Sequence, residues 1–152
     1  MARVTGGLDG PINHGWTPPP ADDSGVRNCT ASDGSDISYP EDGFDVLGLD
    51  GGRGFWFDHR FEIVLDLLRQ EGVAGLWDIG AGTGSMAVRL SRAGIDVVAV
   101  EPLKAGAEAV ARDGITSCCG TPEDPRMPDG CLPACGRFDV REHDEAPDRP
   151  CE

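Results

Sequence analysis

Residues 76–86 read LWDIGAGTGSM, in which a short apolar run containing Asp78 leads into three glycines, Gly80, Gly82 and Gly84. Glycine lets the backbone take left-handed conformations and approach a ligand closely. A glycine-rich turn between a strand and a helix therefore predicts a cradle for a ligand. The elements on either side of the turn indicate which fold carries it.

Helical and strand patterns alternate around this turn. The spacing of apolar residues predicts, in chain order, a helix over 55–72, a strand over 75–79, a helix over 85–94 with Ser85 as N-cap, a strand over 95–101, a helix over 102–114 and a strand over 115–119. The strands are almost continuously apolar, which is typical of a buried parallel sheet. The sequence therefore predicts an α/β fold, a Rossmann-like parallel sheet with helices on both faces.

The two ends of the chain carry weaker patterns. Residues 131–140 form a poor fourth strand, because Pro133 lacks an N–H and Arg137 interrupts a stretch that should be buried. Residues 1–38 are rich in glycine, proline and polar residues, and we expect them to be disordered or irregular. The predicted organisation is an irregular segment over 1–38, a folded domain over 39–143 and an acidic tail over 144–152, with three to four strands in the sheet.

The composition limits the class of ligand. The chain has 152 residues, enough for one domain, and its 27 acidic and 13 basic side chains give a net charge of −14. This charge disfavours a nucleic acid or an anionic membrane as partner. The chain has no apolar run of transmembrane length and no secretory signal pattern at its N-terminus, so we expect a cytoplasmic protein. Its six cysteines lack the paired C-x2-C spacing of a zinc site, and we expect no metal.

Two carboxylates near the glycine turn indicate the kind of ligand. Glu101 stands 21 residues after Gly80, at the end of the next strand, where a carboxylate can accept the hydroxyl groups of a ribose. Asp78 precedes the turn and would repel a pyrophosphate, and the turn has no lysine or arginine to compensate. A ligand with an ammonium and a sulfonium group, such as S-adenosylmethionine, would be attracted instead. The other interpretation of Asp78 is a hydrogen bond to the amides of its own turn.

Residues 76–102 resemble the first two motifs of the class I S-adenosylmethionine-dependent methyltransferases, in particular the type 11/12-like domains. The resemblance extends upstream to 39–69, which contains the stretch FWFDHR, and downstream to 120–143. It implies that the cofactor is S-adenosylmethionine and that the substrate is an unknown small-molecule methyl acceptor.

The resemblance also implies a role for individual residues. Those expected to bind the cofactor are Asp78, Gly80, Gly82 and Gly84 around its methionine end, Glu101 at the ribose, Pro102, Thr121, Pro122 and Glu123 toward the adenine, and Phe57 and Arg60 on a lead-in helix that closes over it. Relatives often have an acidic residue where Thr121 stands. His143 falls near the expected acceptor pocket, and it is the one candidate for a catalytic residue. The residue types themselves favour a core role for Phe55, Trp56 and Phe57 over contact with the cofactor, because aromatic clusters on a helix usually pack in a core. Arg60 and His143 could be solvated surface residues.

The family has seven strands, and this sequence supplies three to four. We therefore interpret the chain as a C-terminally truncated methyltransferase domain with weak or no transferase activity. Two alternatives stay open. One is a non-catalytic remnant that still binds a nucleoside. The other is an NAD(P)-dependent oxidoreductase fragment, which the spacing of the glycines and Asp78 disfavour.

Overall fold

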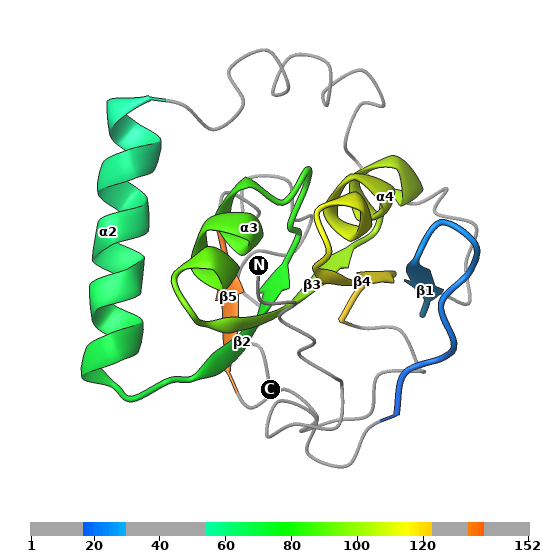
Figure 1. Ribbon diagram of the computed structural model, residues 1–152, viewed down its shortest axis with the longest axis horizontal. Helices are drawn as coiled ribbons and strands as arrows, with labels where there is room; N and C mark the ends of the chain where they lie inside the picture. Colours follow the sequence, from blue (N-terminus) through cyan, green and yellow to red (C-terminus); the bar gives the residue numbers. More distant parts are fainter. Residues whose placement is uncertain (1–16, 30–53, 123–133, 139–152) are drawn as a thin grey trace.

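The computed structural model describes residues 17–29, 54–122 and 134–138, and Figure 1 shows their arrangement. The elements are β1 (Val26–Asn28), α2 (Phe55–Gln70), β2 (Gly75–Ile79), α3 (Ser85–Arg92), β3 (Asp96–Glu101), α4 (Lys104–Arg112), β4 (Thr116–Cys119) and β5 (Cys135–Arg137). Each helix and strand predicted from the apolar spacing between residues 55 and 119 is present, with bounds that differ by a few residues.

The strands form one sheet in the order β1-β4-β3-β2-β5, and every neighbouring pair is parallel. Trp77 at the centre of β2 is paired with Val98 on β3 and with Cys135 on β5. The predicted Rossmann-like α/β fold is confirmed. The sheet has five strands within the described ranges, where the sequence predicts three to four. The poor fourth strand exists as the three-residue β5, with Arg137 half-buried.

The additional strand comes from the segment predicted to be disordered or irregular, and for residues 17–29 that prediction is wrong. The side chain of Val26 is buried against Ala107 and Cys119, and the N–H of Cys29 donates to the carbonyl oxygen of Cys119 at 2.8 Å. A turn at Asp22, whose carboxylate accepts the N–H groups of Ser24 and Val26, leads into the strand. The free edge of β4 supplies the pairing partner of β1, and composition alone cannot reveal this long-range contact. A strand of three residues is also too short to be recognised in a glycine-rich segment.

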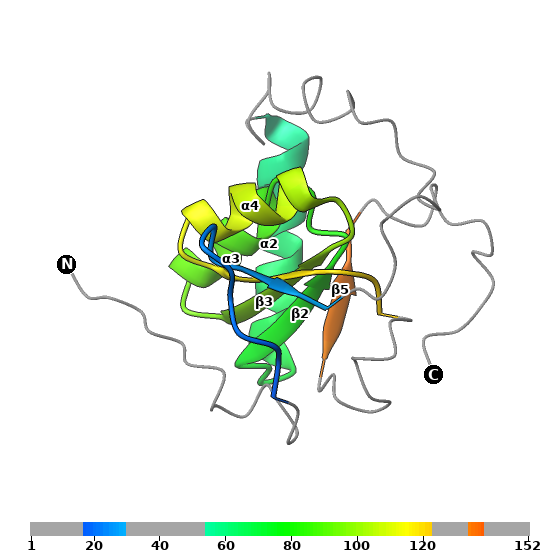
Figure 2. The ribbon, with the colours of Figure 1, turned by 90° about the vertical axis from the view of Figure 1, so that its right-hand side faces the viewer.

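The three described helices lie on one face of the sheet, which corrects the prediction of helices on both faces (Figure 2). The chain runs from β2 through β3 to β4 in one direction across the sheet, so crossovers of the same hand place α3 and α4 on the same side. Helices reach the second face only where the strand order reverses. That second face carries its own buried cluster, made of Cys29, Trp77, Ile79, Val98, Val100 and Cys118.

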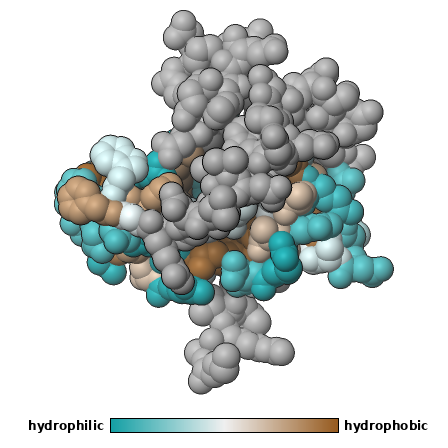
Figure 3. Space-filling model, turned by 90° about the horizontal axis from the view of Figure 1, so that it is seen from above, coloured by the Kyte–Doolittle hydropathy of each residue, from teal (hydrophilic) through white to brown (hydrophobic). Residues whose placement is uncertain are grey.

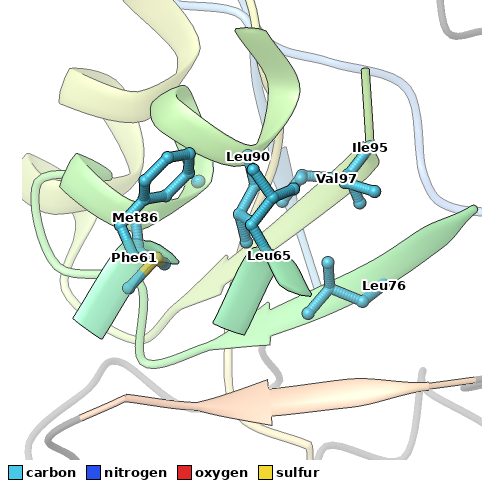
Figure 4. Packing of buried hydrophobic residues seen from close by; sticks show 8 residues of the cluster. Phe61, Leu65, Leu76, Met86, Leu90, Ile95 and Val97 are labelled. Carbon is cyan, nitrogen blue, oxygen red and sulfur yellow. The ribbon is translucent and has the colours of Figure 1, made fainter. Parts of the chain in front are cut away.

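Helix α2 is attached to this helical face by an apolar cluster (Figure 4). Phe61 and Leu65 of α2 pack against Leu90 of α3 and the strand residues beneath, as the predicted helical spacing requires. Arg89 of α3 forms an ion pair with Asp58 at 2.8 Å, and its guanidinium lies 4.4 Å from the centre of the Phe61 ring. These contacts fix the first turns of α2 against α3.

Candidate functional site

The glycine turn lies where the strand order of the sheet reverses. From β2 the chain continues to β3 and β4 on one side, whereas β5 is paired with the other side of β2. In open parallel sheets, ligands bind outside the carboxyl ends of the strands at such a reversal. Residues 80–84 follow the carboxyl end of β2 directly, so the fold places the predicted cradle at the position where this class of sheet binds ligands.

The backbone of the turn needs its glycines. Gly80, Gly82 and Gly84 have φ angles of 73°, 57° and 85°, all in the left-handed region that favours glycine. A Cβ on Gly84 would also lie 2.8 Å from Cγ2 of Val110, because the turn passes directly against α4. Gly84 is the N-cap of α3 and Ser85 is its first helical residue, so the prediction of Ser85 as N-cap is wrong.

Glu101 holds this turn in place. Its Oε2 accepts the N–H of Gly82 at 2.7 Å, and its Oε1 accepts the N–H of Leu103 at 2.9 Å. The N–H groups of Gly80 and Ala81 donate to the carbonyl oxygen of Val100, which precedes Glu101. The hydrogen bond to the turn, considered above for Asp78, is therefore made by Glu101. Each carboxylate oxygen has a second acceptor position, so Glu101 can still accept the hydroxyl groups of a ribose.

The carboxyl group of Asp78 is buried and incompletely hydrogen-bonded. The residue is 1% exposed, and its Oδ2 is buried without a hydrogen-bond partner. Burial, followed by the nearby negative charge of Glu101, raises the pKa of Asp78 to about 7, and the positive charge of Arg60 opposes this rise. Burial also raises the pKa of Glu101, against the two backbone hydrogen bonds that stabilise its charge. A buried, unpartnered carboxyl group is costly, and this cost falls when a ligand supplies a partner.

Arg60 and Phe57 come to the site from α2. They stand three residues apart on the helix, and the guanidinium of Arg60 lies over the ring of Phe57 at 5.2 Å from its centre. Both residues are half-buried, so neither is a simple core or surface residue. Phe55 and Trp56, in contrast, are exposed, so the interpretation of these two aromatic residues as core residues is wrong. The positive charge of Arg60 lowers the pKa of Asp78 against the larger effect of burial, as expected for a cation near this carboxyl group. The structure thus brings together Asp78, Glu101, Arg60 and the glycine turn.

The segments predicted to approach the adenine begin beside Glu101. Pro102 is half-buried, and its carbonyl oxygen accepts from the thiol of Cys119 at 3.6 Å. The N–H of Gly120 donates to the carbonyl oxygen of Glu101, which places the start of the loop containing Thr121 and Pro122 next to the same strand end. Two predicted residues, Glu123 and His143, lie outside the described residues.

Sequence reasoning missed two contributors to the site. Val110 packs behind Gly84, and the N–H of Leu103 stabilises the Glu101 carboxylate. Helical spacing alone could have placed Val110 on the buried face of α4, whereas no pattern marks a backbone N–H as a partner. In residues 17–29, 54–122 and 134–138, no group of three or more His, Cys, Asp or Glu side chains is arranged to hold a metal ion.

None of the helices described in the structure is both long and apolar enough to cross a membrane. No protein-family model and no curated protein matches the chain.

Proposed function

We propose that the chain is a methyltransferase-type domain that binds S-adenosylmethionine through the glycine turn, Asp78 and Glu101. One observation carries the proposal: the Asp78 carboxyl group is buried, and its Oδ2 has no hydrogen-bond partner. This group lies beside the glycine turn, where the strand order reverses. Such a group favours a ligand that brings a hydrogen-bond donor with a positive charge.

The charges around the turn support a cationic ligand over a dinucleotide. A pyrophosphate bound to the turn would lie beside two acidic side chains, Asp78 and Glu101, and the electrostatic repulsion would weaken its binding. The ammonium and sulfonium groups of S-adenosylmethionine are attracted to the same carboxylates. Arg60, on the facing helix, provides a cation for the carboxylate end of the cofactor.

When bound, S-adenosylmethionine supplies a methyl group that is activated for direct displacement. The residues of the chain contribute by binding and orienting the cofactor. Glu101 accepts the ribose hydroxyls while it holds Gly82, and the glycine turn lets the backbone approach the cofactor closely. The proposed acceptor is a small molecule, because a net charge of −14 repels nucleic acid. No described residue is assigned the role of a catalytic base.

Isothermal titration calorimetry with the purified chain tests the proposal. We expect S-adenosylhomocysteine and S-adenosylmethionine to bind at pH 8 and NADH not to bind. Asp78→Asn should weaken the affinity about 10- to 100-fold, which corresponds to the loss of one charge-assisted hydrogen bond. Glu62→Gln, at an exposed position of α2, is the matched control and should leave the affinity unchanged.

The alternatives give different results in the same experiment. Binding of NADH in preference to S-adenosylhomocysteine would support an oxidoreductase. Binding of S-adenosylhomocysteine with no methyl transfer to a panel of small-molecule acceptors would support a non-catalytic nucleoside-binding protein. If none of these ligands binds, the proposal is wrong.

A further inference from the structure

Helix α2 carries a second apolar face that points away from the sheet. Within the described ranges, the large hydrophobic residues that are exposed all belong to α2: Phe55 at 85%, Trp56 at 65%, Ile63 at 56% and Leu67 at 56%. Trp56, Ile63 and Leu67 recur at helical spacing and form one line along the helix, with Phe55 beside its N-terminal end. We call these four residues the α2 stripe. Figure 3 shows apolar surface at the left edge of the molecule, where α2 lies.

The α2 stripe has no role in attaching the helix to the sheet. Phe61 and Leu65, on the opposite side of α2, make that contact, and the ion pair between Asp58 and Arg89 strengthens it. A surface helix normally has a polar outer face. Two apolar faces on one helix indicate that the second is covered by something else in solution.

The size of the stripe suits a small symmetric interface. From their exposed fractions, the four side chains offer about 500 Å² of mainly apolar surface. Two copies of the stripe would bury about 1,000 Å² in total, close to the lower size of specific interfaces. We therefore expect an association of moderate strength, with a Kd on the order of micromolar.

The polar residues that flank the stripe favour a second copy of the chain in an antiparallel arrangement. His59 and Asp66 are both exposed and lie on the same flank of the stripe. If two copies of α2 cross antiparallel with Ile63 near the two-fold axis, His59 of one copy lies opposite Asp66 of the other, and the pair occurs twice. A two-fold parallel pairing would place the flank that carries His59 and Asp66 against the other flank of the partner helix, so this pair could not form. The ring of Phe55 stacks on His59 at 5.9 Å between centroids, which holds the imidazole at the edge of the stripe.

We propose that the chain forms a two-fold symmetric dimer in which the α2 stripes of two copies pack antiparallel, with Ile63 near the axis. This dimer does not depend on the proposed function. Arg60 and Phe57 remain with the site of their own copy.

Sedimentation equilibrium of the full chain over a range of about 1–200 µM tests the proposal. We expect a reversible monomer–dimer equilibrium. Ile63→Glu and Leu67→Glu should each weaken it at least about 100-fold, because a carboxylate would be buried at the centre of the interface. Arg69→Gln is the matched control, since it makes the same change in net charge at an exposed position off the stripe, and it should leave the equilibrium unchanged. Circular dichroism checks that each variant remains folded.

A charge exchange tests the antiparallel arrangement. His59→Asp alone places two carboxylates opposite each other twice and should weaken the dimer several-fold. Adding Asp66→Lys to His59→Asp places opposite charges across the interface and should restore the dimer. A chain that stays monomeric at 200 µM, or a dimer that survives Ile63→Glu, would overturn the proposal. A double variant that stays as weak as His59→Asp would overturn the antiparallel arrangement.

Discussion

The buried carboxyl group of Asp78 should make the stability of the fold depend on pH, and Asp78→Asn isolates this effect. Burial raises the pKa of Asp78 from its ordinary value of 3.8 to about 7 in the folded chain. Between about pH 4 and 7 the folded chain therefore holds a proton that the unfolded chain has released. Below about pH 4, the full contribution of protonated Asp78 to the stability of the folded state is therefore present. This contribution is lost as the pH rises toward 7, and it does not change further above that value.

The size of the effect follows from the two pKa values. The difference between 3.8 and about 7, at ~1.4 kcal/mol for each pKa unit, is worth about 4 kcal/mol in the free energy of unfolding. Asparagine has the same shape and does not titrate. The wild-type chain should therefore lose about 4 kcal/mol relative to Asp78→Asn between pH 4 and pH 8. Any fixed cost of burying the amide is the same at both pH values and cancels in this comparison.

Urea unfolding followed by circular dichroism at several pH values between 4 and 8 measures this difference. Glu62→Gln removes an exposed carboxylate from α2 and should show a stability difference from wild type that hardly varies with pH. If the difference between wild type and Asp78→Asn varies by less than about 1 kcal/mol over this range, the carboxyl group is not held protonated by burial, and the reasoning fails.

The same carboxyl group links ligand binding to a proton. A cationic group beside Asp78 favours its charged form, so binding of S-adenosylhomocysteine at pH 6 should release close to one proton. Calorimetry in two buffers with different heats of ionisation measures the number released. Asp78→Asn should bind without this release, and an equal release from both chains would assign the proton to another group.

Three further substitutions test the packing around the site and at the edges of the fold. Gly84→Ala should lower the free energy of unfolding in urea by about 2–4 kcal/mol. Gly84 has a φ of 85°, and the Cβ of an alanine would press on Val110. A loss below about 1 kcal/mol would contradict this. Val26→Ala should lower the free energy of unfolding by about 1–3 kcal/mol, because Val26 is buried. It should also speed hydrogen exchange in β1 more than in β3. Unchanged exchange in β1 would show that Val26 does not hold the strand in the sheet. Arg89→Ala should lower the free energy of unfolding, measured by thermal unfolding, by only about 1 kcal/mol, because the ion pair of Arg89 with Asp58 is partly exposed. A much larger loss would mean that the attachment of α2 depends on Arg89 more than these contacts indicate.

The elements between residues 55 and 119 could be predicted because their signals are local. The spacing of Phe61 and Leu65 defines one face of a helix, and the β-branched run before Glu101 defines a strand. The glycines of the turn are required by its backbone conformation, so the sequence itself marks the position of the candidate site.

The remaining features depend on contacts that a linear pattern does not carry. The strand β1 has three residues and forms because β4 offers an edge far along the chain. The two carboxylates were identified together, but only the structure shows that Glu101 holds the turn while Asp78 is left without a partner at Oδ2. Which carboxylate receives a given N–H depends on differences of a few ångströms that residue types do not encode.

The pairing of β1 with β4 has a consequence for how the chain folds. Asn28 is paired with Cys119, about 90 residues later, whereas β2, β3 and β4 are linked to one another by single helices. Closing so long a loop has an entropic cost that is compensated only after β4 is in place. During synthesis, β1 leaves the ribosome before the other four described strands, and its partner β4 follows much later. The first of the described strands to be made therefore waits until three others have been made before it can pair.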